Sequence, residues 1–211
     1  MSAKITVWAG EKGGGGKTTN IINVGCHLKE NDQKVLIVDV DPNKSASSWG
    51  VKAGEKGPAV VNITENLKDN VTKLKPHFDY ILIDCEGSLN QTTLDAIKVA
   101  DAVIIPYQPS PLDVWGNASL VELIEARQQL TEGKPVAALL LNAYDRRNKI
   151  SKITLESLKD HVIPLLPVRT SRLTDYVVTL VDGDSVVNLG EDNQAAFETK
   201  QLTKSILELL A

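Results

Sequence analysis

A run of four glycines near the start of the chain constrains the fold more than any other feature. Residues 13–16 are all glycine; a β-branched apolar run precedes them at residues 5–9, and Lys17-Thr18-Thr19 follows them. Because glycine has no Cβ, successive backbone N–H groups in such a turn can curl around phosphate oxygens, and a helix that starts there adds positive potential. A merely flexible turn would not account for the Lys-Thr-Thr that follows. The pattern therefore predicts a strand, a phosphate-binding turn and a helix.

The side chains of this loop have expected roles in holding ATP and Mg²⁺. Lys17 is placed to reach the β- and γ-phosphates, and the hydroxyl of Thr18 is placed to bind the metal ion. The remaining phosphate contacts are expected from the rest of the loop, namely Gly13, Gly14, Gly15, Gly16 and Thr19.

Short β-branched runs alternate with helical patterns along the chain. The sequence predicts strands at residues 5–9, 35–39, 80–84, 102–105, 136–141 and 165–168. It predicts helices at residues 17–31, 63–75, 92–99, 114–130, 153–161 and 193–210. Strands and helices that alternate at this spacing form right-handed βαβ units. The predicted fold is therefore α/β, a doubly wound, mainly parallel β-sheet flanked by helices, as in P-loop nucleoside triphosphatases.

Two further segments and the domain count complete this organisation. Residues 49–58 contain three glycines and are expected to form a loop. Residues 110–113 are expected to form a capping box at the start of the helix that ends at residue 130. No internal repeat or low-complexity tract divides the chain, so residues 1–211 are expected to form a single domain.

Composition narrows the class of protein. Hydrophobic residues make up 42% of the chain and aromatic residues 4%, which suits an aliphatic parallel sheet. A net charge of −4 with a pI near 5.4 means that any contact with nucleic acid or an anionic membrane needs a local basic patch. We expect a cytoplasmic protein, because we find neither a signal-peptide pattern nor an apolar run of roughly 18 residues. Cys26 and Cys85 fit no metal-binding spacing.

The residues just before the glycines depart from the ordinary phosphate-loop pattern. Where that pattern has a glycine this chain has Glu11, and a second lysine, Lys12, stands before the glycine run. The arrangement Lys-Gly-Gly-x-Gly-Lys-Thr resembles the deviant Walker A box of the ParA/MinD family. In that family the first lysine reaches across a sandwich dimer to the phosphates of the partner's ATP. The resemblance implies that Lys12 acts in this way and that Lys17 acts in its own protomer's site.

Aspartates follow two of the predicted strands. Asp39 and Asp41 belong to an Asp-x-Asp-Pro stretch that resembles switch I of the family, and Asp84 ends the strand before residues 85–88, which resemble switch II. The resemblance implies that Asp41 positions or activates the attacking water and that Asp39 supports the metal shell or the loop. Asp84 is interpreted as the Walker B aspartate, which holds Mg²⁺ through water. An aspartate after a strand is also a common helix cap or turn former.

The resemblance extends over nearly the whole chain and is closest to the short ParA partition ATPases that lack an N-terminal helix-turn-helix region. It also rests on residues 106–116, 141–145 and 182–186. Asn142 lies in the second of these segments, and the resemblance implies that it contacts the nucleotide near the adenine.

Two positions differ from many relatives. Glu11 places a carboxylate beside the phosphate loop, where it would weaken nucleotide binding unless it points away or pairs with a lysine. Glu86-Gly87 stands where relatives often have prolines, which leaves the geometry of switch II open.

The function that the resemblance implies is DNA partition. ATP would drive formation of a homodimer or a larger assembly that binds nonspecific DNA on the nucleoid. A ParB- or ParG-like centromere-binding partner would stimulate hydrolysis through an inserted arginine. Contacts to the DNA backbone need clustered basic side chains. The family favours Arg169 and Arg172 for this role, and a second basic run consists of Arg146, Arg147, Lys149 and Lys152.

Other functions remain as alternatives. The same switch could position a protein cargo, or a nucleotide-locked scaffold could turn over little ATP. A MinD-like membrane cycle needs a basic amphipathic C-terminal helix, whereas residues 202–211 hold one lysine and one glutamate, which favours packing on the domain. A biosynthetic enzyme similar to dethiobiotin synthetase shares the loop style. An electron-transfer ATPase similar to the nitrogenase iron protein is excluded, since Cys85 has no suitable cluster-bridging partner.

Overall fold

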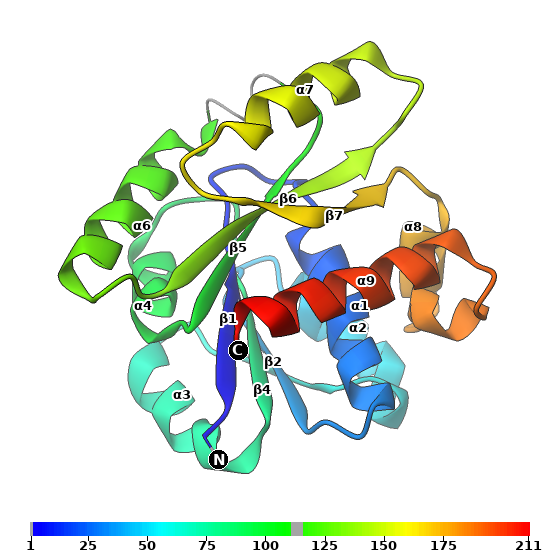
Figure 1. Cartoon of the computed structure of the whole chain (residues 1–211). Coiled ribbons are helices and arrows are strands. Elements are labelled where there is room, and N and C mark those ends of the chain that lie inside the picture. Colours follow the sequence, from blue (N-terminus) through cyan, green and yellow to red (C-terminus); the bar gives the residue numbers. More distant parts are fainter. Residues whose placement is uncertain (1, 111–115) are drawn as a thin grey trace.

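The structure, a computed structural model, describes residues 2–110 and 116–211 (Figure 1). Its strands form one sheet in the order β3-β2-β4-β1-β5-β6-β7, and neighbouring strands all run parallel. The strands are β1 (Lys4–Trp8), β2 (Val35–Asp39), β3 (Ala59–Asn62), β4 (Tyr80–Asp84), β5 (Ala102–Tyr107), β6 (Val136–Tyr144) and β7 (Leu165–Ser171). The predicted doubly wound parallel sheet is confirmed.

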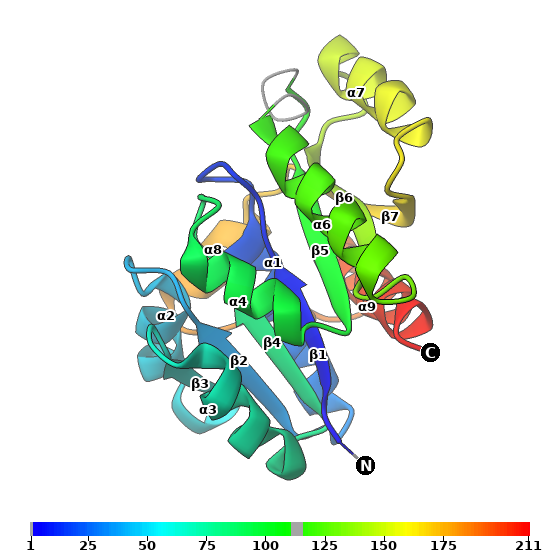
Figure 2. The ribbon, with the colours of Figure 1, turned by 90° about the vertical axis from the view of Figure 1, so that its left-hand side faces the viewer.

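Helices cover both faces of this sheet (Figures 1 and 2). They are α1 (Lys17–Glu30), α2 (Ser45–Ala53), α3 (Leu67–Leu74), α4 (Gln91–Val99), α6 (Ala118–Leu130), α7 (Lys149–Lys159), α8 (Asp175–Val181) and α9 (Gln194–Leu209). Short 3₁₀ turns lie at Gly54–Lys56, Lys75–His77 and Val186–Leu189. Helices α1, α2 and α9 pack on one face of the sheet, and α3, α4 and α6 pack on the other.

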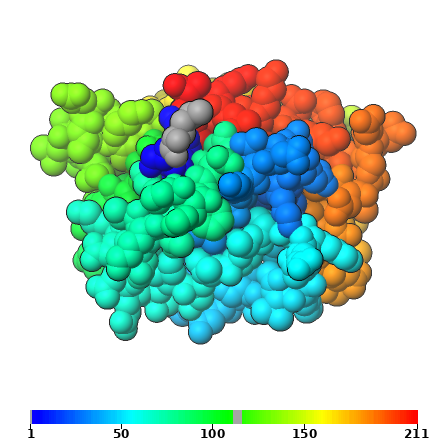
Figure 3. Space-filling model, turned by 90° about the horizontal axis from the view of Figure 1, so that it is seen from below, coloured from blue at the N-terminus to red at the C-terminus, as the bar shows by residue number. Residues whose placement is uncertain are grey.

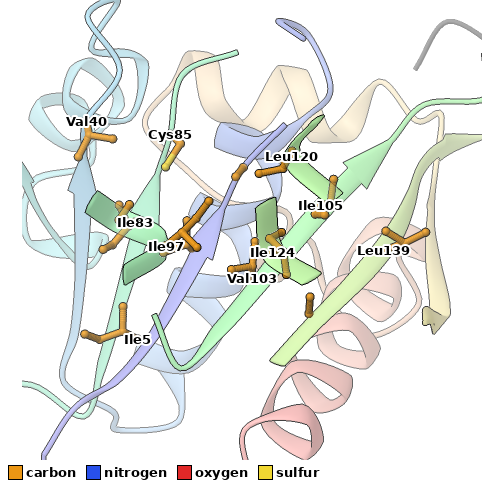
Figure 4. Packing of buried hydrophobic residues seen from close by; sticks show 14 of the residues in the cluster. Ile5, Val40, Ile83, Cys85, Ile97, Val103, Ile105, Leu120, Ile124 and Leu139 are labelled. Atoms are coloured by element: carbon orange, nitrogen blue, oxygen red, sulfur yellow. The ribbon is translucent and has the colours of Figure 1, made fainter. Parts of the chain in front are cut away.

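The core on the second face fixes α4 and α6 against the central strands. Ile97 of α4 and Leu120 and Ile124 of α6 are each at most 1% exposed. In the same cluster, Ile124 lies by Val103 of β5 and Leu120 by Ile105 of that strand (Figure 4). Burying one such side chain stabilises the fold by about 1.5–3 kcal/mol. The helices are therefore held firmly beside the strands whose carboxyl ends form the site described below.

Residues 49–58 do not form a loop, so that prediction is wrong. Most of them belong to α2 and the 3₁₀ turn after it, and β3 follows directly. A Cβ on Gly50 would lie 2.6 Å from Cγ2 of Val60, and a Cβ on Gly57 would lie 2.5 Å from the Trp49 ring. Glycine is needed at both positions because neighbouring segments pack closely there. Sequence patterns alone do not reveal this need.

The helix starts predicted at residues 63 and 153 also differ from the structure. The prediction of a helix from residue 63 is wrong: α3 begins at Leu67, because the Ile63 N–H donates to the Asp39 carbonyl at 3.1 Å and extends the β2–β3 ladder. Helix α7 begins at Lys149, so the prediction of a helix from residue 153 is also wrong. Helix α6 begins at Ala118; residue 114, the predicted start of this helix, and residues 111–113 of the predicted capping box lie outside the described residues.

The C-terminal helix packs on the domain, as predicted. Leu202 and Ile206 of α9 are 1% and 2% exposed, in one cluster with residues of α1. The Lys4 ammonium donates to the Leu210 carbonyl at 2.7 Å, and Figure 3 shows the start of β1 (blue) beside α9 (red) at this end of the molecule. Among the described residues, we find no helix long and apolar enough to cross a membrane.

Candidate functional site

The phosphate loop connects β1 to α1 at the carboxyl ends of the strands. Helix α1 begins at Lys17, and the residue before it, Gly16, has φ 86°, in the left-handed region. A Cβ on Gly16 would lie 2.2 Å from Nδ2 of Asn142. Both the backbone conformation and the packing therefore require glycine at this position.

Side chains below the loop hold its carbonyl groups. Asn142 donates through Nδ2 to the Gly15 carbonyl at 2.9 Å, and Asn20 donates to the Gly16 carbonyl at 2.8 Å and to Oδ1 of Asn142 at 3.0 Å. Gln108 at the end of β5 donates to the Gly14 carbonyl. Asn142 thus shapes the loop, and its contact with the adenine stays a prediction. Asn20 and Gln108 were not predicted, because only the fold brings them to the loop.

The two lysines of the loop lie in different surroundings. Lys17 is 6% exposed, and its ammonium donates to the carbonyl of Lys12 at 3.1 Å. Burial lowers the pKa of Lys17, although the carboxylates of Asp84 and Asp41 oppose that shift. The side chain of Lys12, in contrast, is exposed. One lysine therefore faces the interior of its own site while the other lies at the surface.

Asp84 is a buried carboxylate under the loop. It lies beside Asp39 of β2 and Trp8 of β1 in the sheet register and is 0% exposed. Among the described residues, neither of its oxygens has a hydrogen-bond partner of good geometry. Burial is the main cause that raises its pKa to about 7; the Asp39 charge acts in the same direction, and a hydrogen bond from Thr18 and the charge of Lys17 oppose the shift.

A magnesium ion fits this arrangement. A buried carboxylate without a hydrogen bond of good geometry is costly unless a cation or a water molecule satisfies it. Mg²⁺ usually takes one or two carboxylates and completes its shell with phosphate oxygens and waters. Asp84 and the hydroxyl of Thr18 are the groups that would hold it.

Asp39 organises switch I. Its oxygens accept hydrogen bonds from the N–H of Asp41 at 3.1 Å and from the N–H and hydroxyl of Ser47 at 2.8 and 2.7 Å. Ser47 lies in the first turn of α2, so Asp39 caps that helix. Of the two roles predicted for Asp39, these contacts favour support of the loop, and a role in the metal shell stays a prediction. Asp41 accepts in turn from the N–H of Asn43 at 2.8 Å.

Switch II touches the phosphate loop. A Cβ on Gly87 would lie 2.4 Å from the backbone nitrogen of Gly13 and 2.7 Å from the carbonyl carbon of Lys12. Only glycine permits this approach of the two backbones. The Gly87 that distinguishes the chain from many relatives therefore lets switch II contact the backbone of Lys12.

Glu11 is turned toward α6. Its N–H donates to Oδ1 of Asn117 at 2.8 Å, and its Oε1 accepts from the N–H of Leu120 at 2.7 Å. Leu120 lies in the first turn of α6, where a carboxylate also meets the positive end of the helix dipole. The carboxylate thus binds to the helix, which meets the condition under which it would not weaken nucleotide binding.

Four arginines from two distant segments meet in one hollow of about 470 Å³, beyond the ends of β6 and β7. We call this the basic hollow; its arginines are Arg146, Arg147, Arg169 and Arg172. The Arg169 guanidinium lies 4.6 Å from the centroid of the Tyr144 ring. The two basic runs of the sequence thus contribute to one surface, while Lys149 and Lys152 lie on α7.

Two carboxylates also line the basic hollow, and both are engaged. Asp145 pairs with Nε of Arg147 at 3.3 Å, and Glu198 accepts from the N–H and hydroxyl of Ser171 at 2.7 and 2.6 Å. Because four arginines face these two carboxylates, the hollow keeps an excess of positive charge.

Comparison with known proteins decides the family. Residues 6–196 match the model of the CobQ/CobB/MinD/ParA nucleotide binding domain. The chain belongs to this family. The predicted resemblance to the ParA/MinD family is therefore confirmed.

Three family relatives or neighbours are informative. The maintenance of carboxysome distribution protein A of Halothiobacillus neapolitanus is 31% identical over 202 residues, which cover 93% of each chain. The chromosome partitioning protein ParA of Caulobacter vibrioides is 27% identical over 203 residues, covering 75% of this chain and 76% of that protein. The cobyrinic acid a,c-diamide synthase of Mycobacterium smegmatis, solved with an ATP analogue and magnesium, has a TM-score of 0.78 at 23% identity and covers 98% of this chain and 94% of that chain.

Proposed function

We propose that this protein is a ParA-like ATPase that dimerises on ATP, binds nonspecific DNA and positions a cargo. The observation that carries the proposal is the pair of lysines on one loop. Lys17 is buried at its own site, whereas Lys12 is exposed at the mouth of the same loop. An exposed lysine at this place is suited to reach the phosphates of a nucleotide held by a second protomer.

The residues of the site divide the work of hydrolysis. Asp84 and Thr18 would hold Mg²⁺, which when bound would neutralise phosphate charge. Lys17 binds the β- and γ-phosphates of the ATP in its own protomer. Asp41 orients the attacking water, and Asp39 fixes Asp41 through the bond to its N–H. A partner protein that inserts an arginine at the phosphates would stimulate hydrolysis, so we expect basal turnover to be slow.

The basic hollow is the proposed DNA surface. Arginines bind phosphate oxygens through paired N–H groups and need no particular base sequence. Arg169 and Arg172 remain the proposed contacts, and Arg146 and Arg147 join them because they line the same hollow. The hollow thus supplies the local basic patch that a chain of net negative charge needs for such contacts.

The cargo has two candidates. Partition of a plasmid or chromosome, with a ParB- or ParG-like partner, is supported by the ParA relative. A protein assembly as cargo is favoured by the relative that matches over 93% of both chains, which is a carboxysome distribution protein. A MinD-like membrane cycle is disfavoured, because Leu202 and Ile206 of α9 are buried in the core rather than available for lipid.

Sedimentation velocity with random duplex DNA tests the proposal. We expect monomers with ADP, dimers with ATP and Mg²⁺, and DNA binding by the dimers alone. Monomers that ignore DNA in every nucleotide state would overturn it. Hydrolysis that DNA stimulates in the absence of any small-molecule substrate would exclude a biosynthetic enzyme of the same fold.

A further inference from the structure

Glu11, which precedes Lys12 in the phosphate loop, is bonded to Asn117 and to Leu120 of α6. We propose that Glu11 is a positioning residue for Lys12: it fastens the entry of the phosphate loop to α6 and so sets the place from which the Lys12 side chain extends. The inference rests on the proposed function, because the action of Lys12 in the partner's site comes from there.

The anchor of Glu11 is rigid. Its backbone N–H bonds to Asn117, which is 3% exposed, and its carboxylate bonds to the N–H of Leu120, which is 1% exposed. Leu120 is itself packed against the sheet (Figure 4). A Cβ on the preceding Gly10 would lie 3.4 Å from Oδ1 of Asn117, so the chain passes close to α6 before it reaches the loop. Both attachments therefore lead to buried groups.

The backbone of Lys12 is held on its other sides as well. Its carbonyl accepts from the Lys17 ammonium at 3.1 Å, and Gly87 of switch II lies against the peptide between Lys12 and Gly13. Together with the attachment of Glu11, these contacts fix the main chain while the side chain stays exposed. A long side chain that must meet a phosphate on another protomer does so more readily when its base does not move.

The contact needs a hydrogen-bond acceptor at Glu11 and not a full charge. The N–H of Leu120 requires only one side-chain oxygen, and a glutamine supplies that oxygen at the same reach. An alanine at position 11 removes this oxygen, so the N–H of Leu120 in the first turn of α6 loses its acceptor. Glu11→Gln and Glu11→Ala thus separate the contact from the charge.

The test measures ATP turnover, KM for ATP and melting temperature for these two variants. A matched control is Glu122→Ala, which removes an exposed carboxylate from the same helix. We expect Glu11→Ala to lower kcat roughly tenfold or more at saturating ATP while KM changes less than about twofold. Glu11→Gln and the control should stay within about twofold of the wild type.

A double variant shows whether Glu11 acts through Lys12. In a Lys12→Ala background, Glu11→Ala should cause no further loss, because the side chain that it positions is gone. If Lys12→Ala is impaired but Glu11→Ala turns over ATP like the wild type, the inference is wrong and the proposed function stands. If the two losses multiply, Glu11 acts on the loop alone and the inference is also wrong. If Lys12→Ala itself keeps full turnover, the proposed function is what fails.

A second variant keeps the inference testable should Glu11→Ala not fold. Asn117→Ala removes the acceptor for the backbone N–H of Glu11 and leaves the carboxylate contact in place. It should lower kcat in the same direction, again with little change in KM. An unchanged kcat in a folded Asn117→Ala protein would contradict the inference.

Discussion

Replacing Asp84 with asparagine should stabilise the protein in the absence of nucleotide and magnesium, and by an amount that depends on pH. The pKa of Asp84 rises from 3.8 to about 7 on folding, chiefly through burial. Between these two values the folded protein binds more protons than the unfolded chain, so its stability falls as the pH rises through that window. An asparagine side chain does not titrate, so the stability of the variant does not fall for this reason as the pH rises.

The size of the effect follows from the shift. One pKa unit corresponds to about 1.36 kcal/mol. From about pH 5.5 to about pH 8, the penalty on the carboxylate grows by about 2 kcal/mol and then levels off. The cost of the buried amide is the same at both pH values and cancels in this difference. For a chain of this length, the melting temperature of Asp84→Asn relative to the wild type should rise by about 4–8 °C over that range.

Thermal unfolding followed by circular dichroism, with a chelator and no nucleotide, measures this difference. Asp39→Asn is the matched control, because Asp39 is equally buried but its oxygens accept hydrogen bonds from Asp41 and Ser47. That variant should be less stable than the wild type at both pH values. A melting-temperature difference for Asp84→Asn that does not grow with pH would refute the reasoning that Asp84 is an unsatisfied carboxylate awaiting a cation.

Two other substitutions test the loop and the basic hollow. Gly16→Ala should destabilise the protein by about 1–3 kcal/mol and abolish binding of a fluorescent ATP analogue, since its φ is 86° and its Cβ would overlap Asn142. The stability of Gly13→Ala should change by less than about 0.5 kcal/mol, because a Cβ there meets open space; equal losses in both variants would contradict the loop geometry. Arg169→Ala with Arg172→Ala should reduce the slope of log affinity for random DNA against log salt by about 2, as measured by fluorescence anisotropy. An unchanged slope would place the DNA surface elsewhere.

Local patterns in the sequence predict every described strand except β3, and they point to most of the residues of the candidate site. Short stretches of sequence suffice to recognise the glycine run, the apolar strands and the aspartates at strand ends. Because the strands are parallel, Asp39 and Asp84 lie at the same edge of the sheet. The strand order itself and the pairing of β3 with β2 depend on contacts between distant segments.

What the sequence did not predict arises from such distant contacts. The glycines at positions 50 and 57 indicate a loop by composition, but their reason is the close approach of Val60 and Trp49. The bond from Glu11 to the first turn of α6 joins positions 109 residues apart. The meeting of Arg146 with Arg172 likewise requires β6 and β7 to lie side by side. Local sequence patterns cannot predict such contacts, because the residues involved lie far apart along the chain.

A mixing experiment tests most directly whether two protomers share the site. Lys12→Ala lacks the lysine that acts on the partner's ATP, and Asp41→Asn lacks the carboxylate that orients water in its own protomer. Each variant alone should turn over ATP far more slowly than the wild type. If Lys12 acts across the dimer, a 1:1 mixture forms heterodimers with one complete site each, and about one quarter of the wild-type turnover returns. A mixture that turns over ATP as slowly as its two components would show that Lys12 acts within its own protomer, and the central claim of a shared, ATP-timed dimer switch would be wrong.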